Sequence, residues 1–435
     1  MNEKVSARRA IEALRAGVPN RDAVRELGCS CQEVLAIFDE RLDQLRMSVL
    51  QNRQTRGMLV AAEFGGGKSH VLEYLSHRAR GQNFAVSKVV ISKETQLFDS
   101  LKIFRAAVDN LVLENVVGDA LREIAVDDDR LSPKRPAYGG FERWLRDSGL
   151  NSRFEATVWL YNQTGSDPEL QNELVSFWAG DPIQVGRLRK ALRRCGGGKL
   201  FPLEKIAAKE LARQRFVFTA RLLRAAGYEG WIILLDELEL MGRYTVLQRG
   251  RAYAELARLL GLSEDFPIPG LLTVGAITPN FRSAVISYRG GDDGPGKDDR
   301  DNIGNYFRSR GDSDSKLTAA LAESAMEEIE QRLVLIREPA KDSLPEVLDT
   351  LARVYATAYG FEPARPPIDE YWAYDKSMRQ YVRSWITSWD LNRIAPSYQP
   401  DIEVEPVTDD YSEDELLEKP AEDDREEEPG WGGEP

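Results

Sequence analysis

The chain has 435 residues, of which 42% are hydrophobic and 30% are charged. This composition is typical of a globular protein with about one large or two to three ordinary domains, and it excludes collagen-like and wholly disordered chains. No apolar run approaches the roughly 18 to 20 residues that a membrane span needs. The N-terminus has no apolar signal-peptide core. We therefore expect a cytoplasmic protein with no membrane partner.

The net charge of −13 is concentrated at the C-terminus. Residues 401–435 hold sixteen acidic and two basic residues, whereas residues 1–400 hold 55 acidic and 56 basic ones. Such a tail cannot bury enough apolar surface to offset its ordering entropy, so we expect it to be disordered. It is interpreted first as a solubilising tail, with a tether or a DNA-mimicking competitor for a basic surface as the alternative. The body can still carry a local basic patch.

Residues 7–50 have an amphipathic period that is interrupted at 17–20. The pattern predicts helices over residues 7–15, 22–27 and 32–50. We expect this arm to pack beside the site described next or against a neighbouring subunit.

A glycine-rich segment after a short apolar run gives the clearest functional signal. Met58–Ala62 predicts a strand, and a helical period begins at His70. Glycines let backbone N–H groups approach a phosphate, and the helix N-terminus adds its positive dipole end. Lys68 is expected to reach the β- and γ-phosphates of ATP, and the Ser69 hydroxyl to hold Mg²⁺. The predicted nucleotide-binding residues are Phe64, Gly65, Gly66, Gly67, Lys68, Ser69 and His70.

Phe84–Ser92 predicts the next strand, and 138 residues separate it from Trp231. A plain crossover helix needs only about 20 to 30 residues, so we expect a large, mostly helical insertion at about 99–226. Its basic stretch Arg187–Arg194 is interpreted as a solvated helix face, with DNA or an acidic partner surface as the alternative. A second GGGK string, at 196–199, has no preceding strand and no following hydroxyl, so it is interpreted as a loop.

Trp231–Leu235 reads as a central parallel strand buried on both faces, and it leads into two carboxylates. Asp236 is expected to hold Mg²⁺, and Glu237 to polarise water for attack on the γ-phosphate.

The strand Leu271–Ile277 ends in a polar tip. Asn280 or Thr278 is expected to sense the γ-phosphate there, and a simple turn is the alternative. A flexible loop is expected over 290–314, and an edge strand over 332–337. Five strands alternating with helices predict an α/β P-loop NTPase with a parallel five-stranded sheet and its ligand at the carboxyl ends of the strands.

Helical periods return at 343–359 and 369–389. The segment 376–385 resembles a helical lid that places Arg379, or else Arg383, on the bound nucleotide, and a surface arginine is the alternative. The predicted domains are an N-terminal helical arm at 1–50, a P-loop ATPase core at 51–340, a helical lid at 341–397 and a disordered acidic tail at 398–435.

Four segments together resemble the BrxD-like ATP-binding proteins of bacterial phage-exclusion (BREX) systems: Arg15–Val24, Phe64–His70, Ser87–Thr95 and Trp385–Arg393. The resemblance implies an AAA+ (ASCE-type) ATPase similar to origin-recognition and helicase-loader proteins. It implies partners among other defence proteins, such as a helicase or a methyltransferase. It also implies a homo-oligomer with an arginine finger, for which Arg308 or Arg310 is preferred over Arg282 and Arg332.

Three functions remain open at this point. The first is a Mg²⁺-dependent ATPase that remodels or loads a DNA-associated defence complex. The second is a nucleotide-gated assembly switch or scaffold with slow hydrolysis. The third, a small-molecule kinase, is the weakest because the expected site suits water as the acceptor. The expected catalytic residues are Glu237, Lys68, Asn280 and Arg379.

Overall fold

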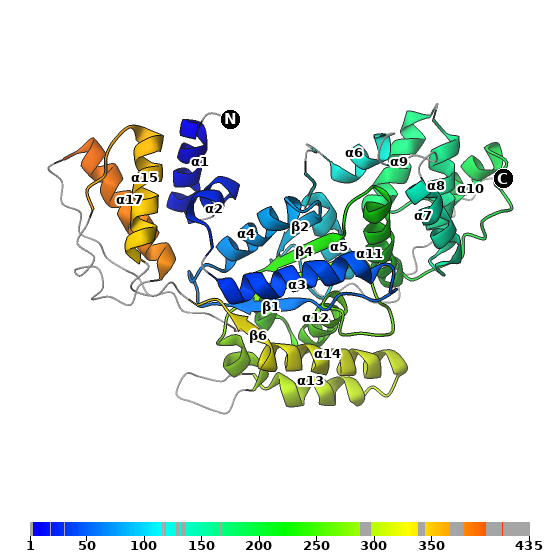
Figure 1. The fold of residues 1–435 in the computed structure, drawn as a ribbon. Coiled ribbons are helices and arrows are strands. Elements are labelled where there is room, and N and C mark those ends of the chain that lie inside the picture. Colours follow the sequence, from blue (N-terminus) through cyan, green and yellow to red (C-terminus); the bar gives the residue numbers. More distant parts are fainter. Residues whose placement is uncertain are drawn as a thin grey trace.

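The computed structural model describes residues 3–17, 19–29, 31–114, 116, 119–127, 131, 136–165, 167–287, 297–337, 344–365, 377–396 and 411. A six-stranded sheet lies at its centre, with the strand order β3-β2-β4-β5-β1-β6. Figure 1 shows helices on both sides of this sheet. The strands are β1 (Met58–Ala61), β2 (Ala85–Val90), β3 (Leu111–Val112), β4 (Trp231–Asp236), β5 (Leu271–Ile277) and β6 (Leu333–Leu335).

The prediction of a five-stranded, wholly parallel sheet was wrong in its count and at one edge. β3 is a sixth strand that pairs antiparallel with β2, while the other neighbouring strands pair in parallel. β3 has only two residues and lies within the segment predicted as a helical insertion. A strand this short leaves no readable alternation of apolar and polar residues. The predicted edge strand at 332–337 is confirmed as β6, next to β1.

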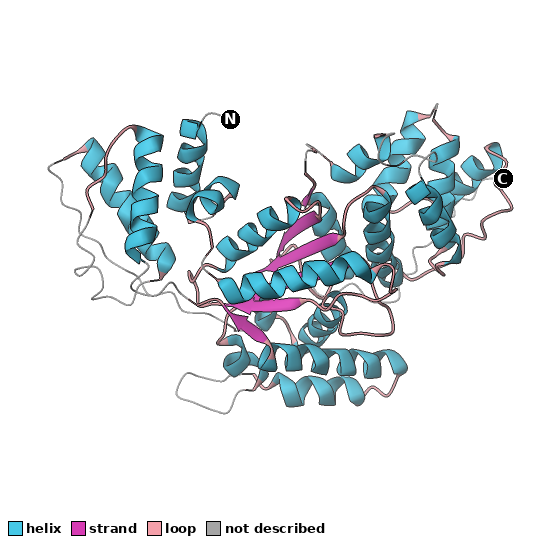
Figure 2. Ribbon diagram, in the orientation of Figure 1, coloured by secondary structure: helices cyan, strands magenta, loops and turns pink. Residues whose placement is uncertain are grey.

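β4 is buried along its whole length, as a central strand should be. Its side chains alternate between two apolar cores. Ile232 and Leu234 face the layer of α3 (Gln32–Ser48) and α4 (Lys68–Arg80). Trp231, Ile233 and Leu235 face the core that contains α5 (Ser100–Asp109), α11 (Ala208–Ala225) and α12 (Val246–Leu259). Full burial of each such side chain contributes about 1.5 to 3 kcal/mol to stability. The helices on the two sides of the sheet give a three-layer α/β/α arrangement (Figure 2).

The insertion between β3 and α11 is helical. Its helices extend the second core, and Trp178 is buried there with its Nε1 donating to Thr157 Oγ1 at 2.9 Å. They are α6 (Ala120–Val126), α7 (Pro136–Asp147), α8 (Ser152–Gln163), α9 (Pro168–Ala179) and α10 (Val185–Arg194).

Helices from the two ends of the chain form one separate apolar core. Ile11, Leu351 and Trp385 are buried together there, and Arg15 forms an ion pair with Asp390 at 2.8 Å. The first two helices of the predicted arm therefore pack with the predicted lid, whereas α3 packs on the sheet (Figure 1). The four helices are α1 (Glu3–Ala16), α2 (Arg21–Leu27), α15 (Leu344–Tyr359) and α17 (Met378–Ile394).

The prediction of a flexible loop over 290–314 was wrong for its second half, which forms α13 (Asp299–Arg308) and the start of α14 (Ser313–Gln331). Buried Asp299 accepts hydrogen bonds from Arg249 Nε at 2.8 Å and from Tyr253 Oη at 3.0 Å. A partner some fifty residues away in sequence leaves no local signal, so composition alone suggested a loop. Residues 288–296 lie outside the described residues.

The tail predicted over 398–435 also lies outside the described residues, with the exception of Tyr411. Within the described part of the chain, no helix has both the length and the apolar composition needed to cross a bilayer.

Candidate nucleotide-binding site

The glycine-rich loop connects β1 to α4 at the carboxyl edge of the sheet. Gly65 and Gly67 have φ angles of 79° and 96°, which favour glycine. A Cβ on Gly65 would lie 2.6 Å from Ser377 Oγ, in the residue before α17. Gly65 is therefore needed both for its backbone conformation and for the close approach of Ser377.

Gly67 is the N-cap of α4, and Lys68 is its first residue. The first N–H groups of a helix have no partner within it, and they lie at the positive end of the helix dipole. A loop with this geometry ahead of a helix of 13 residues fits a phosphate group.

The Lys68 side chain is buried, with 8% of it exposed. Its Nζ donates to the Ala62 carbonyl at 3.1 Å and forms an ion pair with Glu239 Oε1, also at 3.1 Å. Burial raises the pKa of the Glu239 carboxyl to about 7, although Lys68 acts to lower it. Within the described residues, Glu239 Oε2 is buried with no hydrogen-bond partner. Lys68 is thus held by a carboxylate whose own bonding is incomplete.

Glu239 was missed in the sequence analysis. It lies in the 3-10 helix η1 (Leu238–Arg243), which directly follows the predicted Asp236–Glu237 pair. A third acidic residue so close to the end of the strand was the available signal. The direction of its side chain, however, depends on the turn that follows β4, which the sequence alone does not reveal.

Asp236 ends β4 and is almost fully buried. Its Oδ1 accepts a hydrogen bond from the Glu237 backbone N–H at 3.1 Å, and its Oδ2 lies 3.8 Å from Lys88 Nζ in β2. Lys88 was also missed, although it is the one charged residue in the apolar run 84–92. The structure thus places a cation beside the carboxylate predicted to bind metal.

Glu237 adopts the left-handed conformation, with φ 63° and ψ 35°. This conformation costs a residue other than glycine about 1 to 2 kcal/mol, and such strain is frequent at functional sites. Glu237 begins the η1 turn that brings Glu239 back toward Lys68. The strained turn therefore places Glu239 beside Lys68, where the charge of Glu237 also acts on it.

The polar tip of β5 lies between β4 and β1 in the sheet order. Thr278 is buried and Asn280 is half-buried. Both are hydrogen-bonded to the hydroxyl of Tyr411, each at 2.8 Å. The strand order thus brings the predicted sensor residues to the same edge as Asp236 and the glycine-rich loop.

The structure brings Arg379 to the glycine-rich loop from α17. Its backbone N–H donates to the Gly65 carbonyl at 3.3 Å, and its guanidinium lies 5.5 Å from the centre of the Phe64 ring. Its Nε donates to the Gly17 carbonyl at 3.1 Å. Arg383, the second candidate, is exposed on the same helix. Arg379 therefore links the lid, the N-terminal helices and the loop.

His70 faces the N-terminal helices. Its Nε2 lies 2.8 Å from the Gly28 carbonyl oxygen at the end of α2, and burial lowers the pKa of the imidazole. A neutral ring is thus favoured, with Nε2–H donating to the carbonyl. His70, predicted as a nucleotide-binding residue, here ties α4 to α2.

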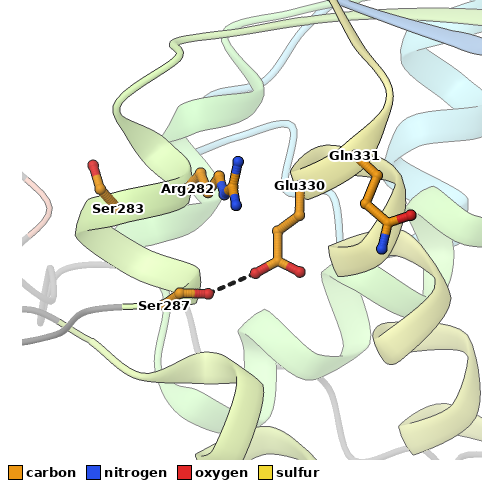
Figure 3. Close-up of a pocket in the computed structure, with 5 residues that line it drawn as sticks. All are labelled: Arg282, Ser283, Ser287, Glu330 and Gln331. Atoms are coloured by element: carbon orange, nitrogen blue, oxygen red, sulfur yellow. Dashed lines mark hydrogen bonds between the residues drawn. The ribbon is translucent and has the colours of Figure 1, made fainter.

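Three of the four arginine-finger candidates have contacts with residues outside the glycine-rich loop. Arg308 pairs with Glu323, and Arg310 lies over the Tyr306 ring at 5.7 Å. Arg282 begins η2 (Arg282–Ile286) and lines a pocket in which Ser287 Oγ donates to Glu330 Oε1 (Figure 3). No residue of the glycine-rich loop lines this pocket.

A mostly parallel α/β sheet with a glycine-rich loop between β1 and α4 defines a P-loop-like nucleotide-binding fold. Residues 3–128 match the family model described as BREX system ATP-binding protein BrxC/D. Over these residues, which are less than half of the chain, the chain is similar to that family of ATP-binding proteins of BREX antiviral defence, and this likeness confirms the resemblance seen in the sequence. The match includes the glycine-rich loop and ends before β4, so Asp236, Glu237 and Asn280 lie outside it.

The comparison with curated proteins gave no match, and neither did the comparison with solved structures.

Proposed function

We propose that the chain is a Mg²⁺-dependent ATPase of the AAA+ type that remodels or loads a DNA-associated anti-phage complex. The observation that supports this most is the buried pair of Lys68 and Glu239, which joins the glycine-rich loop to the acidic end of β4. Parallel strands present their carboxyl ends at one edge, and this supports a shared site for the residues that follow β1, β4 and β5.

ATP binding exchanges the partner of Lys68. A carboxylate whose pKa is raised to about 7 is poorly stabilised in its charged form. The phosphates of ATP carry more charge and accept bonds from the α4 N-terminus as well. Lys68 therefore moves from Glu239 to the β- and γ-phosphates.

Ser69 and Asp236 are the groups we propose to hold Mg²⁺. The described residues contain no group of three His, Cys, Asp or Glu side chains placed to hold a metal. Phosphate-bound Mg²⁺ needs only one or two protein oxygens, and the buried Asp236 carboxylate at the strand end suits this. When bound, the ion neutralises charge on the phosphate oxygens.

Glu237 is the general base in this proposal, and it accepts the proton of the attacking water. Asn280 donates a hydrogen bond to the γ-phosphate from the neighbouring strand.

A nucleotide-gated switch is the second candidate, and the contacts of Arg379 support it. The lid residue bonds to Gly65 of the loop and to Gly17 of the N-terminal helices. A phosphate that shifts the loop therefore alters the contact between the loop and the core formed by α1, α2, α15 and α17. Assembly of a homo-oligomer is the readout we propose for this change.

DNA is a proposed partner through α10. Leu188, Ala191 and Leu192 are buried on one face of this helix. Arg187 forms an ion pair with an acidic residue of α9, and Arg194 forms one with the acidic residue that directly precedes α9. The remaining exposed cations are Arg189, Lys190 and Arg193. Replacing these three residues with Gln should lower the affinity for DNA. The slope of the logarithm of the binding constant against the logarithm of salt concentration should become shallower by about three at most.

Phosphate release from ATP tests the proposal. Wild type and Glu237→Gln are compared with and without double-stranded and single-stranded DNA, and molar mass is measured alongside. DNA-stimulated release that is lost in Glu237→Gln supports the ATPase. Equal release from the two proteins contradicts the role of Glu237. ATP-dependent assembly without release supports the switch.

A further inference from the structure

Tyr411 is the one residue of the acidic segment 401–435 that the structure describes. Its hydroxyl donates to Asn280 Oδ1 at 2.8 Å and lies 2.8 Å from Thr278 Oγ1. Because a phenol has a single proton, the Thr278 hydroxyl donates to Tyr411. Both polar groups at the tip of β5 are therefore bonded to the tail.

The ring of Tyr411 fits between η1 and η2. It packs edge-on against buried Phe281, with 5.9 Å between the ring centres. A Cβ on Gly242 would lie 2.7 Å from Tyr411 Cδ1 and 3.2 Å from both Phe281 and Val285. The absence of a side chain at Gly242 thus makes room for this ring.

This contact lies at the proposed nucleotide site. Gly242 belongs to η1, the turn that also carries Glu239 and so reaches Lys68. Thr278 and Asn280 follow β5, between the strands that carry the glycine-rich loop and Asp236. Tyr411 therefore binds the residues that we propose to sense the γ-phosphate.

The sequence around Tyr411 carries charge of the same sign as ATP. Asp409, Asp410 and Glu413 are within two positions of it. Covalent geometry keeps the Cα atoms of such residues within about 7 Å of the Tyr411 Cα. A docked Tyr411 therefore brings negatively charged chain to the tip of β5, where we propose that the γ-phosphate is sensed.

We propose that Thr278, Asn280, Gly242 and Phe281 form a docking site for Tyr411 of the same chain. Tyr411 docked there opposes ATP binding because it occupies the groups that we propose to sense the γ-phosphate, an inference that rests on the nucleotide site proposed above.

ATP binding to full-length variants tests the competition. Tyr411→Ala should tighten ATP binding about three- to tenfold, and Tyr411→Phe should do so less because it keeps the ring. Gly242→Ala should act like Tyr411→Ala, since it fills the ring's place from the opposite side. Tyr306→Ala is the matched control, because Tyr306 is 39% exposed on α13. Unchanged or weaker ATP binding in Tyr411→Ala would overturn the competition.

Hydrogen exchange without nucleotide tests the docking separately. Tyr411→Ala should increase exchange in η2, while Tyr306→Ala should leave it unchanged. No change in η2 would overturn the docking site. If η2 responds but no variant binds ATP, the docking site stands and the proposed nucleotide function fails.

Discussion

Lys68 pairs with Glu239 at the sheet edge, and Arg249 pairs with Asp299 between α12 and α13. Both pairs are buried, and burial raises the pKa of both carboxyls. Asp299 accepts from Arg249 Nε at 2.9 Å and 2.8 Å through its two oxygens, and Tyr253 Oη bonds to it as well. Glu239 has one contact to Lys68 at 3.1 Å and one oxygen without a partner in the described residues.

The two pairs differ in how completely their carboxylates are hydrogen-bonded, and this difference suits Arg249–Asp299 to a structural role and Lys68–Glu239 to a binding role. A buried ion pair recovers its desolvation cost only when the remaining lone pairs are also satisfied. The Arg249–Asp299 pair meets this condition and fixes α13 to α12. The Lys68–Glu239 pair does not meet it, and we therefore expect that a phosphate can replace Glu239 with little loss to the fold.

The largest expected effect comes from breaking the satisfied pair. Asp299→Ala leaves the buried guanidinium of Arg249 without a carboxylate, so we expect a loss of about 3 to 5 kcal/mol in unfolding free energy. Chemical denaturation measures it. The matched variant Glu239→Ala should cost clearly less, and equal losses in the two variants would contradict the comparison.

Asp236→Asn should abolish Mg²⁺-stimulated phosphate release, because an amide is a weaker magnesium ligand than a carboxylate. Release is measured over a titration of Mg²⁺. Asp299→Asn serves as the control, since its carboxyl lies in the structural pair, and its folded fraction should keep the stimulation. Retained stimulation in Asp236→Asn would show that another group holds the metal.

The pH dependence of stability sharpens the comparison at Glu239. Its folded-state pKa of about 7 is above the unfolded value, so the folded protein binds the proton more tightly. Its contribution to stability is therefore fully present below pH 4.5 and is lost as the pH rises through 7. Between pH 4.5 and pH 8, the free energy of unfolding of Glu239→Gln should rise relative to that of wild type by on the order of 2 kcal/mol. Denaturation at four pH values measures the difference, and a constant difference would contradict the raised pKa.

The smallest effect is expected at the lid. Arg379→Ala removes the guanidinium contacts to Gly17 and Phe64 but keeps the backbone bond to Gly65, so ATP affinity should fall only about threefold. Arg383→Ala is the control on the exposed face of the same helix. A similar change in both variants would argue against a specific role for Arg379.

The sequence predicts the central strands and the glycine-rich loop well because their signals are local. β4 is a run of apolar residues, and the loop lies between a strand and a helix. β3 escapes prediction because two residues show no period. The fold class could therefore be predicted, but not the antiparallel edge.

The contacts that complete the site depend on tertiary structure. Glu239 reaches Lys68 only because Glu237 adopts a left-handed turn. Arg249 and Asp299 are distant in sequence, and their separation hid the helix that Asp299 begins. Tyr411 is an aromatic residue in an acidic run, and its partners lie more than 130 positions away. Composition describes such a segment as a whole but cannot identify one residue that docks.

Equilibrium binding of ATP to wild type and Lys68→Ala tests the central claim most directly, with circular dichroism to show that both proteins are folded. We predict that wild type binds ATP and that Lys68→Ala loses at least about a hundredfold in affinity, or roughly 2.8 kcal/mol. Equal affinity in the two folded proteins would contradict the assignment of the nucleotide site to the loop between β1 and α4.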